Sequence, residues 1–226
     1  MLRRLLLTLS LLAVTAASAL AAARAPQIPV SGTALATFFA SQGQTINVNT
    51  QQLDLQTLSV PATTSFEVRV FDLASAGTSF GAYSTALASP PLYLIAPAAA
   101  VSGGFETASF RTGPTRIVVN LFDAGSAFQG STTYLAGPPD PNAFGFYDQL
   151  SGGQSFFTQD ARNAGGTARI LAYNGTGSRF GWTWFACETG AGPGGDYADF
   201  VALVNLSLAP TEVQRTDWGT LKQRFR

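Results

Sequence analysis

The chain has 226 residues, and its 13 basic and 13 acidic side chains give it no net charge at neutral pH. Only 12% of the residues are charged, so no extended basic face can form to neutralise phosphates, which argues against a nucleic-acid partner. Histidine is absent. Its absence removes Ser-His-Asp and Cys-His catalysis, the usual zinc sites and the usual general base near neutral pH.

The first residues have the three parts of an export signal. Arg3 and Arg4 form a positive region, residues 5–14 are apolar, and residues 19–23 offer two A-x-A cleavage sites. We therefore expect residues 1–23 to be removed and the mature chain to be secreted, or held at the cell surface or in the periplasm. A membrane-anchor helix is the alternative, but no later stretch approaches the roughly 20 apolar residues needed to span a bilayer. No transmembrane segment is expected after cleavage.

A short helix is predicted near the start of the mature chain. Leu35, Phe38 and Phe39 recur at helical spacing within residues 33–40, behind a Ser-Gly-Thr start. Gly43 is expected to end the segment, because glycine punctuates helices.

Short segments of strand-like pattern, separated by turn residues, follow through the rest of residues 24–208. No helical pattern alternates with them, so we predict an all-β domain, an antiparallel β-sandwich or jelly roll. The expected strands are residues 45–48, 53–56, 65–71, 92–95, 105–110, 116–122, 134–135, 143–147, 155–157, 168–173, 180–186 and 200–204.

The segment 209–226 differs in charge from the domain before it. It carries four basic residues against two acidic ones. Trp218, Leu221, Lys222 and Phe225 fall at i, i+3, i+4 and i+7, which predicts a short C-terminal amphipathic helix. This basic tail would dock on the sandwich or fray, or it would bind a partner or an envelope component.

Three acids surround a glycine-rich turn between the last two predicted strands. Glu188 ends one strand, and Asp196 and Asp199 precede the next. Carboxylate and loop carbonyl oxygens are the ligands that Ca²⁺ prefers, so these three residues are a candidate calcium site. Asp160 is a further candidate ligand and Asp148 a weaker one. Both residues could instead be turn formers. The alternative for Asp196 and Asp199 is that their side chains bond to nearby backbone N–H groups in a turn.

Two other features bear on function. Cys187 is the only cysteine, so no intrachain disulfide can form, and we expect a buried thiol. Trp182, Trp184, Tyr147 and Tyr197 could stack on sugars or could belong to the core. The sequence therefore favours a non-enzymatic surface or matrix protein, with binding of cell-surface polysaccharide or adhesion as the alternative. A glycosidase that uses two carboxylates is a second alternative, but no pair of acids is marked out by spacing.

Residues 194–201 (GGDYADFV), preceded by an aromatic strand that ends in Glu188, resemble an uncharacterised domain of bacterial exported proteins. That domain often accompanies the PEP-CTERM sorting tail, and its signature reads roughly E-D, a glycine loop, then G-D-x-D-Y-N-D-V-V. The resemblance implies an all-β exported module with a calcium-type site at Glu188, Asp196 and Asp199 and no known enzymatic activity. The chain departs from the signature at Ala198, where the motif has asparagine, and at Thr189, where a second acid often stands. It also lacks the Val-Pro-Glu-Pro signal of the sorting tail.

Overall fold

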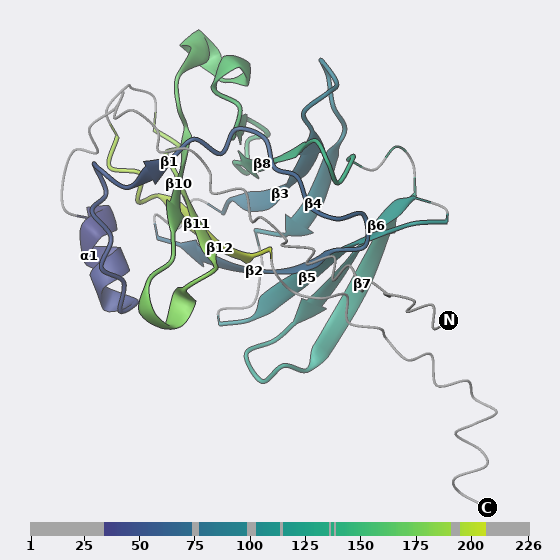
Figure 1. Cartoon of the computed structure of the whole chain (residues 1–226), viewed down its shortest axis with the longest axis horizontal. Coiled ribbons are helices and arrows are strands. Elements are labelled where there is room, and N and C mark those ends of the chain that lie inside the picture. Colours follow the sequence, from purple (N-terminus) through teal and green to yellow (C-terminus); the bar gives the residue numbers. More distant parts are fainter. Residues whose placement is uncertain are drawn as a thin grey trace, which may run out of the picture.

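The computed structural model describes residues 34–73, 77–98, 103–113, 115–135, 137, 139–190 and 195–206. Within these residues the chain forms two antiparallel sheets and one short α-helix, which confirms the predicted all-β sandwich (Figure 1). The predicted export signal and the predicted C-terminal helix lie outside the described residues. Among the helical residues that are described, none belongs to a helix of the length and apolarity that a membrane crossing requires.

The larger sheet has eight strands and the smaller one four. In spatial order the larger sheet contains β1 (Gln52–Leu53), β10 (Ile170–Asn174), β11 (Thr183–Cys187), β12 (Phe200–Asn205), β2 (Ser65–Asp72), β5 (Phe105–Arg111), β6 (Arg116–Phe122) and β7 (Phe128–Tyr134). The smaller sheet contains β4 (Leu92–Ala96), β3 (Ser79–Ser84), β8 (Phe144–Gln149) and β9 (Ser155–Phe157). Short 3₁₀ turns follow at Asp160–Arg162, Ala164–Gly166 and Gly177–Arg179.

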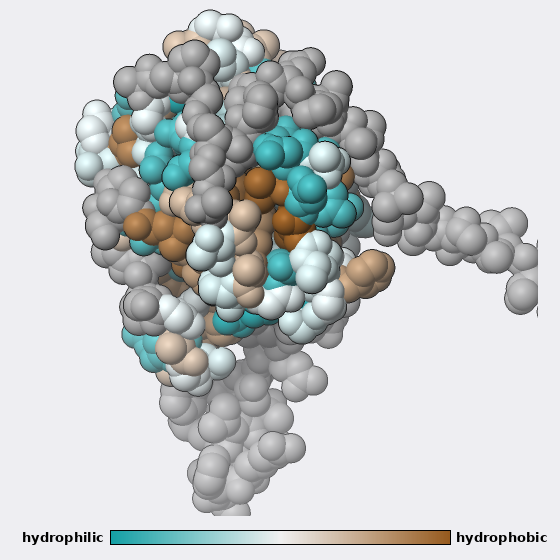
Figure 2. Space-filling view, turned by 90° about the vertical axis from the view of Figure 1, so that its left-hand side faces the viewer, coloured by the Kyte–Doolittle hydropathy of each residue, from teal (hydrophilic) through white to brown (hydrophobic). Residues whose placement is uncertain are grey.

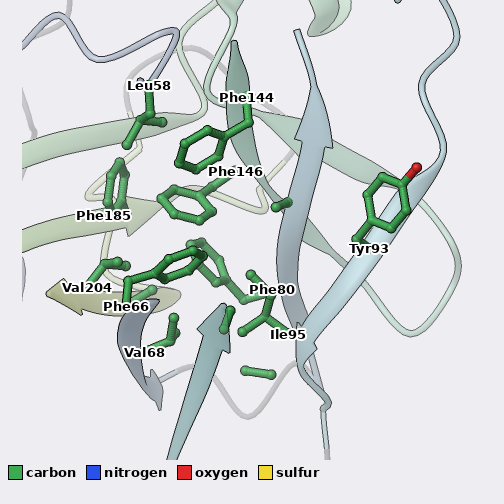
Figure 3. Close-up of a cluster of buried hydrophobic side chains, with 14 of the residues drawn as sticks. Leu58, Phe66, Val68, Phe80, Tyr93, Ile95, Phe144, Phe146, Phe185 and Val204 are labelled. Carbon is green, nitrogen blue, oxygen red and sulfur yellow. The ribbon is translucent and has the colours of Figure 1, made fainter. Parts of the chain in front are cut away.

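The main core lies between the two sheets and is rich in phenylalanine (Figure 3). The Phe146 ring lies 5.0 Å from both Phe80 and Phe185, measured between ring centroids. Phe66 lies 5.9 Å from Phe146, so rings from both sheets interdigitate. The alternation of apolar and polar residues in β2 follows from this arrangement, because one face of the strand meets the smaller sheet.

A second core lies on the opposite face of the larger sheet, beneath α1 (Ala34–Ser41). Phe39 of this helix is fully buried, 5.5 Å from Trp184 and 5.3 Å from Tyr173 between ring centroids. β10, β11 and β12 are therefore covered on both faces, which explains why they read as nearly continuous apolar runs. The helix predicted at residues 33–40 is confirmed.

Two glycines of the smaller sheet stand directly opposite tyrosines of the neighbouring strand. Gly81 pairs with Tyr147, and Gly145 pairs with Tyr83. A Cβ atom on Gly81 would lie 2.6 Å from the Tyr147 ring, and one on Gly145 would lie 2.7 Å from the Tyr83 ring. Glycine is required at both positions because each tyrosine ring lies against the opposing backbone.

One strand of the structure was not predicted, and another was predicted only at its end. β3 (Ser79–Ser84) was not predicted at all, because its small residues hide the alternation. β7 was predicted only at residues 134–135, although it begins at Phe128. Most of its side chains are exposed on both faces, so an alternating pattern is not required of it.

Three predicted strands were wrong in place. The strand predicted at residues 53–56 overlaps β1 (Gln52–Leu53) only at Leu53. Residues 45–48 form no strand, because the Asn47 side chain accepts hydrogen bonds from the backbone N–H groups of Asn49 and Thr50 and makes a turn. The strand predicted at residues 180–186 begins only at Thr183, after the 3₁₀ turn Gly177–Arg179.

Candidate functional site

The acidic loop joins β11 to β12, and two of its three predicted acids face each other across the hairpin. Cys187 at the end of β11 pairs with Phe200 at the start of β12. Glu188 and Asp199 are the next residues on each strand. The hairpin therefore brings these two carboxylates together at the base of the loop, as the metal hypothesis requires of them.

Both oxygens of Glu188 accept hydrogen bonds from the backbone of the loop. The N–H of Gly190 donates to Oε1 at 2.7 Å, and the N–H of Tyr197 donates to Oε2 at 3.3 Å. The carboxyl group lies so close to Gly195 that a Cβ atom there would be 1.5 Å from Oε2. Glycine at position 195 lets the Glu188 carboxyl group take this position against the loop backbone.

Asp199 holds the other side of the loop. Its Oδ2 atom accepts hydrogen bonds from the backbone N–H of Thr189 at 2.8 Å and from the Thr189 hydroxyl at 2.7 Å. Thr189, which stands where the motif of the resembled domain often has a second acid, is therefore a hydrogen-bond donor to Asp199. Together Glu188 and Asp199 clamp both ends of the loop.

The two carboxyl groups titrate as a pair with opposite shifts. Burial raises the pKa of Glu188, and the charge of Asp199 adds to the rise against the backbone hydrogen bonds. Burial alone would raise the pKa of Asp199 too, but the hydrogen bonds from Thr189 and from Glu188 outweigh it and lower that pKa. Glu188 is thus the member of the pair that holds a proton more readily, and Asp199 the member that stays charged.

The remaining predicted ligands do not join this pair. Oδ1 of Asp196 accepts a hydrogen bond from the backbone N–H of Ala198 at 3.1 Å, which is the turn role weighed against metal binding. Asp160 begins a 3₁₀ turn beside β9, at an edge of the other sheet. In the part of the chain that the structure describes, no three Asp, Glu or Cys side chains are grouped so that they could hold a metal ion.

A calcium ion bound by all three carboxylates would require the hydrogen bonds of these side chains to rearrange. Backbone N–H groups already point at both oxygens of Glu188 and at one oxygen of Asp196, and Thr189 occupies one oxygen of Asp199. A cation would have to compete with these donors. The arrangement can close the loop without a metal.

Two buried acids elsewhere were missed or underrated by sequence reasoning. Asp148 is fully buried in β8 and not in a turn, and neither of its carboxylate oxygens makes a hydrogen bond of good geometry, although the Gln149 N–H and the Thr78 hydroxyl lie near enough to oppose the rise in its pKa. Burial, together with the charges of Asp199 and Asp72, raises the pKa of Asp148 to about 7. Glu106 in β5 is 4% exposed, and burial raises its pKa to about 7. Each has the same strand parity as buried phenylalanines, and this signal would have identified both.

The predicted aromatic binding residues are mostly part of the core. Trp184, Tyr147 and Tyr197 are at most 2% exposed. Trp182 is half-buried, with the Arg179 guanidinium 5.1 Å from its ring centroid. Cys187 is fully buried, as predicted, and burial raises the pKa of its thiol well above the ordinary value.

A pocket of about 460 Å³ lies apart from the acidic loop. Its lining contains both polar and apolar residues, among them Ser84, Leu87, Phe110, Arg111, Thr115 and Asp140. Asp140 is the only carboxylate among the described lining residues, and its Oδ1 atom accepts hydrogen bonds from the backbone and the side chain of Asn142.

Comparison with known proteins adds no relative. No family model matches the chain, no curated protein is similar to it, and no solved structure matches its fold.

Proposed function

We propose that the chain is an exported, non-enzymatic β-sandwich module of a cell surface or extracellular matrix. The observation that carries this proposal is the state of the acidic loop, whose carboxylates hydrogen-bond to the loop itself. Glu188 binds the N–H groups of Gly190 and Tyr197, and Asp199 binds Thr189. Side chains used in this way stabilise a hairpin and are not free to act on a substrate. The export-type N-terminal sequence supports the proposed location at a cell surface or in an extracellular matrix.

Binding of a cell-surface polysaccharide is the alternative function. Three of the four aromatic residues considered for sugar stacking are buried, which leaves Trp182 as the partly accessible one. Figure 2 shows the side of the molecule that carries α1, where hydrophobic groups are interspersed with hydrophilic ones. Such a mixed surface suits a module in contact with water better than a continuous stacking platform.

A pull-down on insoluble polysaccharides separates the two functions. A structural module should remain in solution with cellulose, chitin and peptidoglycan, whereas a carbohydrate-binding module should be retained by at least one of them. Retention that Trp182→Ala abolishes would replace the structural proposal with the carbohydrate one. Gln154→Ala, at an exposed position away from the pocket, serves as the control variant.

The glycosidase alternative requires two carboxylates on opposite sides of a substrate. The described pocket contributes Asp140 alone, so its lining favours the non-enzymatic proposal.

Calcium binding at the loop remains a proposal of its own. An extracellular site with a Kd of about 10⁻⁴ to 10⁻³ M would add on the order of 1 kcal/mol at millimolar calcium. Thermal melting with calcium and with a chelator tests it. An unchanged melting temperature would refute the calcium proposal. The loop would then be closed by its hydrogen bonds alone.

A further inference from the structure

Three of the four outer strands are protected against pairing with another chain. β1 has two residues, and β4 lies between Pro91 and Pro97. β9 has three residues, and the Asn163 side chain closes its outer edge: Nδ2 donates to the carbonyl of Phe157 at 2.9 Å, and Oδ1 accepts from its N–H at 2.8 Å. Proteins commonly blunt sheet edges by short strands, proline or side-chain caps.

β7 is the exception. It has seven residues, contains no proline and no charged residue, and in the described part of the chain it pairs only with β6 (Figure 1). Its outer edge therefore presents a row of backbone N–H and C=O groups. The end of the strand is fixed, because the Tyr134 hydroxyl donates to the carbonyl of Leu94 at 3.1 Å.

The two ends of β7 carry exposed apolar side chains on one face. Phe128 is 61% exposed and Leu135, the residue after the strand, is 63% exposed. Phe128 pairs with Phe122, whose side chain points away from the smaller sheet. Leu135 follows Tyr134, which packs toward the smaller sheet, so strand alternation places Leu135 on the same outer face as Phe128.

We propose that β7 pairs antiparallel with β7 of a second copy of this chain, about a two-fold axis at Thr132. This register places Thr132 opposite its own copy and Gly130 opposite Tyr134 of the second copy, where the glycine leaves room for the ring. It also places Leu135 opposite Gln129 of the second copy, next to Phe128, at each end of the interface. A two-fold interface must be self-complementary, and this strand satisfies that condition in polarity, side-chain size and charge.

The second copy is the occupant that the strand's own residues specify. A neutral strand opposes no like charges when it pairs with itself, and threonine pairs across strands are favourable. Two symmetric Phe128–Leu135 contacts cover apolar surface that is exposed in the single copy. The contact is one strand wide, below the size of a permanent interface, so the association is reversible and depends on concentration.

Sedimentation analysis of the full chain over a range of concentrations tests the proposal. The chain should form a dimer as its concentration rises, and Thr132→Lys should weaken dimerisation at least tenfold because two ammonium groups would then lie opposite each other. Ser151→Lys, which adds the same charge at an exposed turn between β8 and β9, should dimerise like the unmodified chain. Both variants should keep the melting temperature of the unmodified chain, since both positions are exposed.

A cysteine at the axis tests the register. Thr132→Cys should form a disulfide-linked dimer on mild oxidation, because only this position faces itself, whereas Gln129→Cys should not. A chain that stays monomeric at millimolar concentration overturns the proposal. So does a Thr132→Lys variant that dimerises normally, and so does a monomer whose β7 amides are protected from hydrogen exchange by another part of the same chain.

Discussion

Replacement of Glu106 by glutamine should make the protein's stability less dependent on pH. Glu106 lies on β5 with the strand parity of Ala108 and Phe110, which belong to the core between the sheets. It is 4% exposed, and its Oε2 atom has no hydrogen-bond partner. Burial raises its pKa from 4.5 to about 7, against an opposing hydrogen bond with its own backbone.

The sign and size of the effect follow from the two pKa values. The folded state holds the Glu106 proton more tightly than the unfolded state does, so the protonated acid gives full stability below about pH 4.5. Between about pH 4.5 and 7 the unfolded state binds fewer protons, and the free energy of unfolding falls as pH rises. The difference between 4.5 and about 7, at roughly 1.4 kcal/mol for each pKa unit, amounts to about 3 kcal/mol.

Urea unfolding of the unmodified chain and of Glu106→Gln at pH 3.5 and pH 8 measures this effect. The stability of the variant relative to the unmodified chain should be about 3 kcal/mol more favourable at pH 8 than at pH 3.5. Any fixed cost of burying the amide cancels in this comparison, and so does the contribution of Asp148, which both chains share. Asp54→Asn, at an exposed position where the new amide oxygen can still accept the hydrogen bond from Gln56, controls for the loss of one negative charge. A pH-independent difference between Glu106→Gln and the unmodified chain would refute the reasoning.

Two further substitutions test the packing. Gly81→Ala should lower the free energy of unfolding by about 1–3 kcal/mol in urea, because its Cβ would lie 2.3 Å from the Tyr93 carbonyl oxygen; Gly152→Ala, where nothing lies within 4 Å of the added atom, should change it little. Phe39→Ala should cost about 3–5 kcal/mol and shift tryptophan fluorescence to the red as Trp184 loses its cover, and an unshifted spectrum would contradict the placement of α1.

The elements predicted from sequence are those whose residue pattern reflects which of their faces are buried. β2 alternates from Phe66 to Val70 because one face of this segment meets the core between the sheets, and β12 is apolar from Phe200 to Val204 because both of its faces are covered. β7 escaped detection because neither face is covered for most of its length. β3 escaped because Gly81 interrupts its pattern where the Tyr147 ring of β8 needs space, which only the tertiary structure reveals.

The candidate site was predicted in part for a comparable reason. Glu188 and Asp199 flank a hairpin, so antiparallel pairing of the strands is enough to bring them together. Asp196 lies within the loop, where the local backbone decides the direction of its side chain. Its Oδ1 atom accepts a hydrogen bond from the backbone N–H of Ala198. Sequence spacing can place residues at the same end of two strands, but it cannot say whether their oxygens meet a cation or a backbone N–H group.

The unequal sizes of the two sheets connect the core, the helix and the β7 edge. A four-stranded sheet covers only part of one face of an eight-stranded sheet. The rest of the larger sheet must be covered by another element or be exposed. At β10–β12 the chain supplies α1 and buries Phe39 and Trp184. At β7 the described residues supply no such cover, and between Phe128 and Tyr134 the strand consists of glycine and polar, uncharged residues. Charge or proline would have closed this edge at little cost to stability. Their absence from β7, when proline flanks β4 and Asn163 caps β9, is the reason to expect a second copy there.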